Sequence, residues 1–299
     1  MVNLRTDLAV ESVYTHEGAG IEQYNEKMGD INVTTIKITT EEASKEVNKP
    51  IGTYVTIESD FILKNDTEKS KELSEVLSKK LKEMMKKYFS EIPVDKRILV
   101  CGLGNRNITA DALGPDCVKG IMITNHIIDI LNSDGITFSK VSAITPGVMG
   151  ITGIETNNII KGIKDEYNPS LIIAVDALCA RSAKRMFGTV QITDTGINPG
   201  SGVGNRRAGI NEKTMGIPVI AIGVPTVVDA NSIIYDTLNG IKKYTDDEIN
   251  DILKNVDSYF VSPKDIDSLI EKSSKIVANG INLSLHKDID FSFIENYIA

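Results

Sequence analysis

Short apolar runs alternate with amphipathic segments along the middle of the chain. From Thr67 to Tyr88 apolar residues recur at helical spacing and stop before Pro93, which predicts a helix that covers one face of a sheet. The segments that follow predict strands at 97–101, 140–145, 171–175, 188–192 and 218–224, with helices over 121–131 and from Gly153. This alternation indicates an α/β fold whose mostly parallel sheet is flanked by helices.

The first 60 residues follow a different pattern. Two β-like runs, Asn32 to Ile38 and Gly52 to Ile57, stand among acidic and polar segments and predict an N-terminal β-rich appendage with antiparallel strands. We therefore expect one α/β domain with its core at about 95–230. Local signals predict helix starts at Thr152 and Thr245, each followed by a glutamate three residues later, and at Ser262-Pro263 for the last helix.

The composition argues against two classes of protein, those that bind nucleic acid and those that span a membrane. The 299 residues are 41% hydrophobic and carry a formal net charge of -8, so we expect no direct contact with nucleic acid. No run approaches the roughly 18 apolar residues of a membrane span, and no basic flank precedes an apolar stretch, so we expect a cytoplasmic protein. The three cysteines have no CxxC spacing and form no even set, which fits a reducing compartment.

Two aspartates stand at the ends of predicted parallel strands. Asp111 follows the strand at 97–101 through a glycine-rich turn, and Asp176 directly follows Ile172-Ile173-Ala174-Val175. Helices cover both faces of such a sheet, so ligands bind at the carboxyl ends of the strands. The two carboxylates are expected to meet in one cleft, although a helix cap or a strand-end turn would also explain each of them.

Glycine-rich loops do not complete a nucleotide motif. Gly102-Leu103-Gly104 lacks the third glycine of the dinucleotide fingerprint, because Asn107 occupies that position, and the chain has no Gly-Lys-Ser/Thr of a P-loop. In the run 199–205, Pro199 breaks the nucleophile-elbow pattern around Ser201. That run is either a surface loop or a segment that contacts substrate.

Histidine and cysteine chemistry has little support. The three histidines are isolated, so no Ser-His-Asp triad or zinc site forms locally, and we expect no metal or cofactor. Cys179 precedes Arg181 by two residues, which makes a lowered thiol pKa and a cysteine nucleophile conceivable. A buried free cysteine is the more common arrangement.

Several ordered motifs together resemble one family, the germination proteases of endospore-forming bacteria. The resemblance runs from Arg5 to the final helix, and the segments that carry it are 5–11, 102–105, 111–115, 146–155, 176–182, 199–205 and 216–230. It implies an atypical aspartic endopeptidase, made as a zymogen and assembled as a homotetramer, that degrades small acid-soluble spore proteins in the forespore and spore core. It also implies an α/β core similar to that of hydrogenase-maturation peptidases.

The resemblance assigns roles to individual residues. Asp111 and Asp176 match the family's two essential aspartates, while Ala110 stands where proline is common and Cys179 where a small residue is usual. Two carboxyls that share a proton can divide the roles of general acid and general base. Asp176 is our first choice as the base. Because the two groups titrate together, the sequence leaves this assignment open. Candidate substrate contacts are Arg181, Gly200, Ser201 and Gly202.

The start of the chain resembles the sequence that the family cuts in its substrates, Thr-Glu-(apolar)-Ala-Ser-Glu. In Thr6-Asp7-Leu8-Ala9-Val10-Glu11 the matching bond joins Asp7 and Leu8, so we expect self-cleavage there, a propeptide of residues 1–7 and a protease domain of residues 8–299. We expect this polar start to be exposed. Two alternatives stay open: a metal-dependent peptidase of the hydrogenase-maturation type, and a binding module without catalysis.

Overall fold

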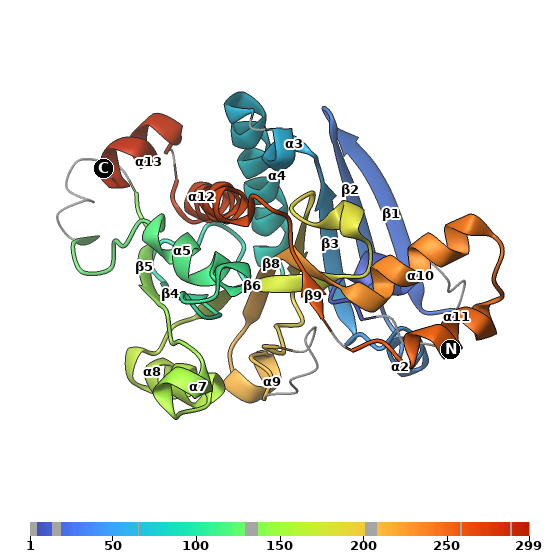
Figure 1. The fold of residues 1–299 in the computed structure, drawn as a ribbon. Helices are drawn as coiled ribbons and strands as arrows, with labels where there is room; N and C mark the ends of the chain where they lie inside the picture. Colours follow the sequence, from blue (N-terminus) through green and yellow to red (C-terminus); the bar gives the residue numbers. More distant parts are fainter. Residues whose placement is uncertain are drawn as a thin grey trace.

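A single mixed sheet forms the centre of the protein (Figure 1). The computed structural model describes residues 5–13, 19–64, 66–128, 137–200, 208–257, 259–287 and 289–298. Within them the strand order is β1-β2-β3-β7-β8-β6-β4-β5, and β9 pairs with β8. The strands are β1 Ile21–Met28, β2 Ile31–Ile38, β3 Gly52–Glu58, β4 Arg97–Gly102, β5 Lys140–Ile144, β6 Leu171–Ala180, β7 Thr189–Thr193, β8 Val219–Asp229 and β9 Phe260–Val261.

The sheet has a parallel half and an antiparallel half. β5, β4, β6 and β8 are parallel neighbours, which confirms the α/β core expected from the alternating segments. β1, β2, β3 and β7 are antiparallel and continue the sheet from the other edge of β8. The N-terminal β-rich part is therefore joined to the core sheet through β3 and β7, and the sheet as a whole is mixed.

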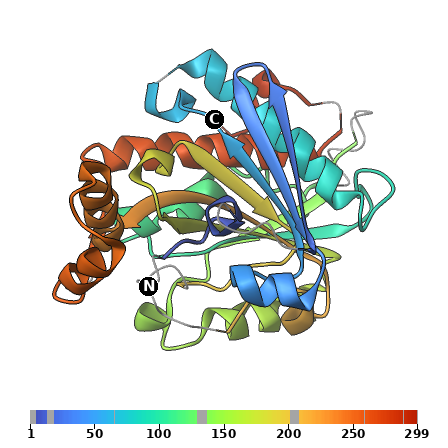
Figure 2. The ribbon, with the colours of Figure 1, turned by 90° about the vertical axis from the view of Figure 1, so that its right-hand side faces the viewer.

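Helices cover both faces of this sheet, as Figure 2 shows for α12 and α8 on opposite sides. The core cluster on one face includes side chains of α4, α5 and α12, and the clusters on the other include side chains of α1, α2 and α8. The helices are α1 Ala9–Val13, α2 Glu41–Val47, α3 Phe61–Lys64, α4 Thr67–Met85, α5 Leu113–Lys119, α7 Met149–Thr152, α8 Thr156–Tyr167, α9 Glu212–Met215, α10 Ala230–Ile241, α11 Asp246–Leu253, α12 Ile266–Leu285 and α13 Phe291–Ile298, with short 3-10 turns η1 Thr109–Asp111 and η3 Ala183–Arg185.

The largest core cluster depends on a close helix crossing. α4 buries its apolar stripe against the sheet and α12, which confirms the amphipathic helix predicted from Thr67. At the crossing, a Cβ on Gly280 would lie 2.6 Å from a methyl carbon of Leu77. The hydroxyl of Ser74 also donates to the carbonyl of Ile276 at 3.1 Å. A side chain at position 280 would push α12 away from α4 and open the core.

Three local predictions are wrong. Residues 121–127 of the helix expected over 121–131 are not helical, and Ile128 is the first helical residue there: the Met122 N–H binds the Asn282 side chain, and the Thr124 and Asn125 N–H groups bind the Val141 carbonyl. α8 begins at Thr156 with Glu155 as N-cap, and the Thr152 hydroxyl binds within its own turn. α12 begins at Ile266, after Pro263, and α13 follows it.

The capping box at Thr245 is confirmed. Its hydroxyl accepts the Glu248 N–H, and the Glu248 carboxylate accepts the Thr245 N–H, at the start of α11. Each of these bonds satisfies a backbone donor that has no partner inside the helix. In the part of the chain that is described, we find no helix with both the length and the apolar character needed to span a bilayer.

Candidate active site

A tight turn after β4 determines the position of Asp111. The Leu103 N–H donates to the Val175 carbonyl at 2.8 Å, so the chain still runs beside β6 when it leaves β4. Gly104 then adopts a φ of +108°, and a Cβ there would lie 2.1 Å from the Asp111 carbonyl oxygen. Only glycine allows this approach, which lets the Asn105 N–H donate to that same oxygen at 3.0 Å. The glycines that suggested a phosphate loop therefore bring Asp111 to the strand ends.

Two further contacts attach the Asp111 turn to the sheet. A Cβ on Gly114, at the start of α5, would lie 2.3 Å from the Leu103 carbonyl oxygen and 2.5 Å from that of Val175, so α5 can start directly against both strand ends. The Thr226 hydroxyl on β8 donates to the Ala110 carbonyl at 2.6 Å. The turn is thus fixed to β4, β6 and β8, the strands around the candidate site.

Asp176 lies within β6 rather than after it. Its residue is 5% exposed and pairs with Gly223 on β8, and its carboxylate accepts the Ala177 N–H at 3.0 Å. Asp111 and Asp176 both line a cavity of about 1420 Å³ at the strand ends. Both carboxylates therefore border one space that is large enough for a segment of polypeptide.

The start of the chain lies along this cavity. The Asp7 N–H donates to the Cys179 carbonyl and the Cys179 N–H donates to the Asp7 carboxylate, each at 2.9 Å. Leu8 is fully buried in a cluster with residues of β2, β3 and β6. The expectation of an exposed start is wrong from Thr6 onward, because Leu8 completes an apolar cluster and the backbone beside it is hydrogen bonded.

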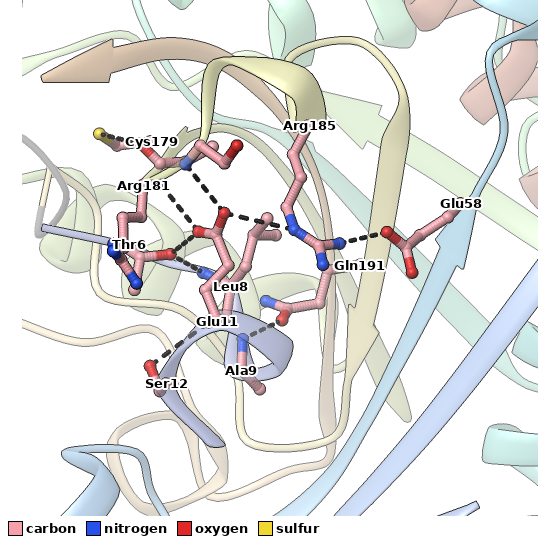
Figure 3. Close-up of polar contacts among 12 residues, drawn as sticks. Thr6, Leu8, Ala9, Glu11, Ser12, Glu58, Cys179, Arg181, Arg185 and Gln191 are labelled. Atoms are coloured by element: carbon pink, nitrogen blue, oxygen red, sulfur yellow. Dashed lines mark hydrogen bonds and ion pairs between the residues drawn. The ribbon is translucent and has the colours of Figure 1, made fainter. Parts of the chain in front are cut away.

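Glu11 attaches the same segment to the turn after β6, as Figure 3 shows. Its side chain is 5% exposed and accepts the N–H of Arg181 at 2.7 Å and that of Ser182 at 3.0 Å. The Thr6 hydroxyl and the Arg185 guanidinium also bind its carboxylate, and Arg185 extends on to Glu58. Charge-assisted bonds to both oxygens hold Glu11 in one orientation.

The other candidate substrate contacts differ in position. Arg181 and Gly200 line the cavity, and the Arg181 guanidinium lies 3.6 Å from the Asp236 carboxylate and over the ring of Tyr235. Ser201 and Gly202 lie outside the described residues. Arg181 thus belongs to the cavity wall through its side chain and to the Glu11 site through its backbone.

Cys179 does not have the environment of a nucleophile. It is buried, and burial together with the nearby charges of Asp7, Asp229 and Glu11 raises the pKa of its thiol to about 12. The conceivable lowering of its pKa by Arg181 is therefore wrong, and the thiolate is not available near neutral pH.

Metal-ligating side chains are not clustered in the described structure. Across the described residues, no group of three or more His, Cys, Asp or Glu side chains is arranged to hold a metal ion. His126 is exposed, and His286 lies in the core, where its Nδ1 accepts the Ser139 N–H.

Sequence reasoning missed two residues that contact the N-terminal segment. The Lys49 ammonium donates to the carbonyls of Thr6 and Asp7, and the Gln191 amide group binds both the Asp7 carbonyl and the Ala9 N–H. Lys49 precedes a proline in a loop and Gln191 lies in a short strand, so neither stands in a recognisable motif. The resemblance of Thr6–Glu11 to a cleavage sequence is the sequence signal that indicates a bound segment here.

Comparison with known proteins gives the family. The family model described as germination protease matches residues 4–257. The chain belongs to the germination protease family. Curated germination proteases agree along the whole chain: that of Clostridium tetani is 40% identical, with 99% of this chain and 100% of the relative covered, and that of Clostridium perfringens is 41% identical, with 100% of each covered. That of Priestia megaterium is 38% identical over 96% of this chain and 95% of its own length.

Family membership makes this chain a peptidase of spore germination. The comparisons do not support the alternative of a metal-dependent peptidase. A solved structure, the nickel–iron hydrogenase maturation protease HycI of Thermococcus kodakarensis, is a distant likeness: it is 17% identical with a TM-score of 0.34, and the match covers 64% of this chain and 92% of that one.

Proposed function

We propose that this germination protease is an aspartic endopeptidase in which Asp111 and Asp176 carry out the proton transfers of peptide hydrolysis. The observation that supports this most strongly is that both carboxylates and the N-terminal segment border the same cavity. Hydrolysis requires a base that takes a proton from water and an acid that protonates the leaving nitrogen. Two neighbouring carboxyls that hold one proton between them can supply both, and the pair titrates as a unit.

The protein is made as a zymogen that cuts itself between Asp7 and Leu8. Residues 1–7 are the propeptide and residues 8–299 the mature domain. Support comes from the way the segment is bound: backbone bonds join Asp7 to β6, Leu8 fills an apolar site and Glu11 occupies a charged one. Asp7 is thus bound through its backbone beside a strand, as an added peptide would be, and the first turn of α1 carries Glu11 into its site.

The substrates are small acid-soluble spore proteins, cut at a sequence like that of the bound segment. A substrate with an acidic residue before the bond, an apolar residue after it and a glutamate three residues further on would make the contacts of Asp7, Leu8 and Glu11. The enzyme acts in the spore core as a homotetramer. Light scattering on the purified chain measures that assembly independently of the chemistry.

Incubation with one purified small acid-soluble spore protein tests the function. Mass analysis of the fragments should give one primary cut that follows an acidic residue, and N-terminal sequencing of the enzyme should give a chain that begins at Leu8. Asp176→Asn protein is the matched control, because it removes a proton-transfer group at nearly constant shape. If the enzyme has lost residues 1–7 and the substrate still stays intact, the substrate assignment is wrong. If Asp176→Asn protein cuts the substrate as fast as the wild type does, the aspartate mechanism is wrong.

A further inference from the structure

Two side chains converge on one carbonyl oxygen at the start of the chain. The Asp7 carbonyl accepts a hydrogen bond from the Lys49 ammonium at 3.0 Å and another from the Gln191 amide at 3.2 Å. Backbone–backbone bonds make up about two-thirds of the hydrogen bonds in proteins, so backbone carbonyls are most often satisfied by backbone donors. Here the doubly bound carbonyl belongs to the bond between Asp7 and Leu8.

Lys49 comes from the loop between α2 and β3, far along the chain from both aspartates. It also donates to the Thr6 carbonyl at 3.1 Å, so both of its described hydrogen bonds go to the backbone of the N-terminal segment. Burial lowers the pKa of Lys49, and the nearby charges of Asp7 and Glu11 oppose this effect. Lys49 is half-buried, and a cation partly shielded from water interacts more strongly than an exposed one with negative charge that develops on the oxygen it contacts.

The sheet register relates Gln191 to Asp176. Gln191 on β7 and Asp176 on β6 both pair with Gly223, which lies on β8 between them. Paired residues of neighbouring strands project to the same face, so the two side chains stand on one face, two strand spacings or roughly 10 Å apart. Gly223 has no side chain of its own, the Leu178 side chain lies over it at 2.5 Å from where a Cβ would stand, and Gln191, Asp176 and Gly223 all line the cavity.

We propose that Lys49 and Gln191 form an oxyanion hole for the cleavage of the bond between Asp7 and Leu8. This inference rests on the self-cleavage proposed above and assigns to these two residues the stabilisation of the intermediate. A protein substrate bound in the same register presents its own carbonyl to the same two donors.

The step balances with the groups already named. A water oxygen bonds to the Asp7 carbonyl carbon, and the proton that it loses passes to the ionised carboxylate of the aspartate pair. The electrons of the C=O double bond move to oxygen, whose negative charge is stabilised by the Lys49 ammonium and the Gln191 N–H. Collapse restores the double bond and breaks the C–N bond, and the Leu8 nitrogen takes a proton from the protonated carboxyl.

Two variants of the full chain test the proposal through the first-order rate at which residues 1–7 are lost. Lys49→Met removes the cation at similar length. Gln191→Glu keeps an acceptor for the Ala9 N–H but removes the donor to the Asp7 carbonyl. Each should slow cleavage by about 10²–10³-fold, the usual cost of losing an oxyanion donor. Lys164→Met on α8 and Gln23→Glu on β1 are matched controls and should leave the rate unchanged.

Hydrogen exchange at the amides of Ala9 and Cys179 separates catalysis from docking. Slow cleavage with both amides still protected supports the oxyanion hole, whereas slow cleavage with lost protection would show that the two residues only dock the segment and would overturn it. If Lys49→Met does not fold, Gln191→Glu decides by the same criteria. If the wild type loses residues 1–7 and both variants lose them at the same rate, the oxyanion hole is wrong and self-cleavage stands. A wild type that never loses residues 1–7 while cutting substrate overturns self-cleavage and this inference together.

Discussion

Asp7 and Cys179 are joined by two hydrogen bonds, one from each backbone N–H to an oxygen of the other residue, both 2.9 Å long. Cys179 lies three residues after Asp176 on β6. The residue before the expected cleavage site is therefore attached to the strand that carries one of the two aspartates. This attachment uses the backbone of Cys179 and leaves its thiol out of the contact with Asp7.

Asp111→Asn and Asp176→Asn should each reduce substrate cleavage by at least about a hundredfold, the usual share of one general acid or base. Asparagine has nearly the same shape, so both chains should still unfold in one cooperative thermal transition. Fragment analysis by mass measures the cleavage and calorimetry the unfolding. Asp165→Asn on α8, whose carboxylate pairs with Lys164 at the surface, is the control that loses a charge elsewhere. Near-normal turnover of either site variant would refute the aspartate pair.

Glu11→Gln should loosen the N-terminal segment. The change removes the ion pair with Arg185 and weakens two charge-assisted bonds from backbone N–H groups, a loss of about 1–3 kcal/mol of docking free energy. Hydrogen exchange at the amides of Leu8 to Val13 should accelerate at least about fivefold, and Glu22→Gln on the exposed face of β1 should not change it. Equal protection in Glu11→Gln and wild type would mean that the buried Leu8 and the hydrogen bonds of Asp7 and Ala9 hold the segment without the Glu11 charge.

Arg185→Met tests the same site from the other side. Arg185 binds both Glu11 and Glu58, so Arg185→Met removes two ion pairs at once. Glu58→Gln measures the contribution of the pair with Glu58. A double-mutant cycle with Glu11→Gln isolates the pair, which we expect to be coupled by about 1 kcal/mol in the docking free energy. Additive effects would show that the backbone amides of Arg181 and Ser182 hold Glu11 without help from the guanidinium.

The sequence predicted those elements whose apolar pattern repeats along the chain. The helix from Thr67 was found because its apolar residues follow a helical period, and the strands that precede Asp111 and contain Asp176 because each is a continuous apolar run. The predicted helix over 121–131 failed in its first part, where the Met122 N–H binds the Asn282 side chain, 160 residues away. No local pattern reports a partner at that distance.

The same limit applies to the candidate site. Asp111 and Asp176 follow from strand ends and motifs, but Lys49 and Gln191 act through contacts with residues 42 and 184 positions away. The buried state of Leu8 was missed for a related reason. A polar start predicts exposure only if nothing in the fold binds it, and here β6 and the turn after it do.

Cys179→Ser should retain most of the activity. Its contacts with Asp7 are made by backbone atoms, and burial raises the pKa of its thiol to about 12, so thiolate chemistry contributes nothing near neutral pH. Thiol reagents should inactivate the native enzyme slowly, at a rate that follows local opening of the core. A serine variant without activity, together with rapid inactivation of the wild type by thiol reagents, would instead favour a cysteine nucleophile.

His286 should make the fold sensitive to acid. Its side chain is buried after α12, against the ring of Phe138, and desolvation lowers its pKa from 6.5 to about 4. The folded state therefore prefers neutral histidine, so this contribution to stability is complete above pH 6.5 and is lost as the pH falls from 6.5 towards 4. At about 1.4 kcal/mol for each pH unit the loss amounts to roughly 3 kcal/mol.

Urea unfolding at a series of pH values between 7 and 4 measures this contribution. His286→Gln should be less stable than wild type at pH 7 and should lose stability less steeply towards pH 4, since glutamine takes up no proton in the unfolded chain. His126→Gln, which changes an exposed histidine, should follow the wild-type curve. Parallel curves for wild type and His286→Gln would mean that His286 takes up its proton over the same pH range in the folded and the unfolded chain, and any acid sensitivity would then have to arise from the carboxylates.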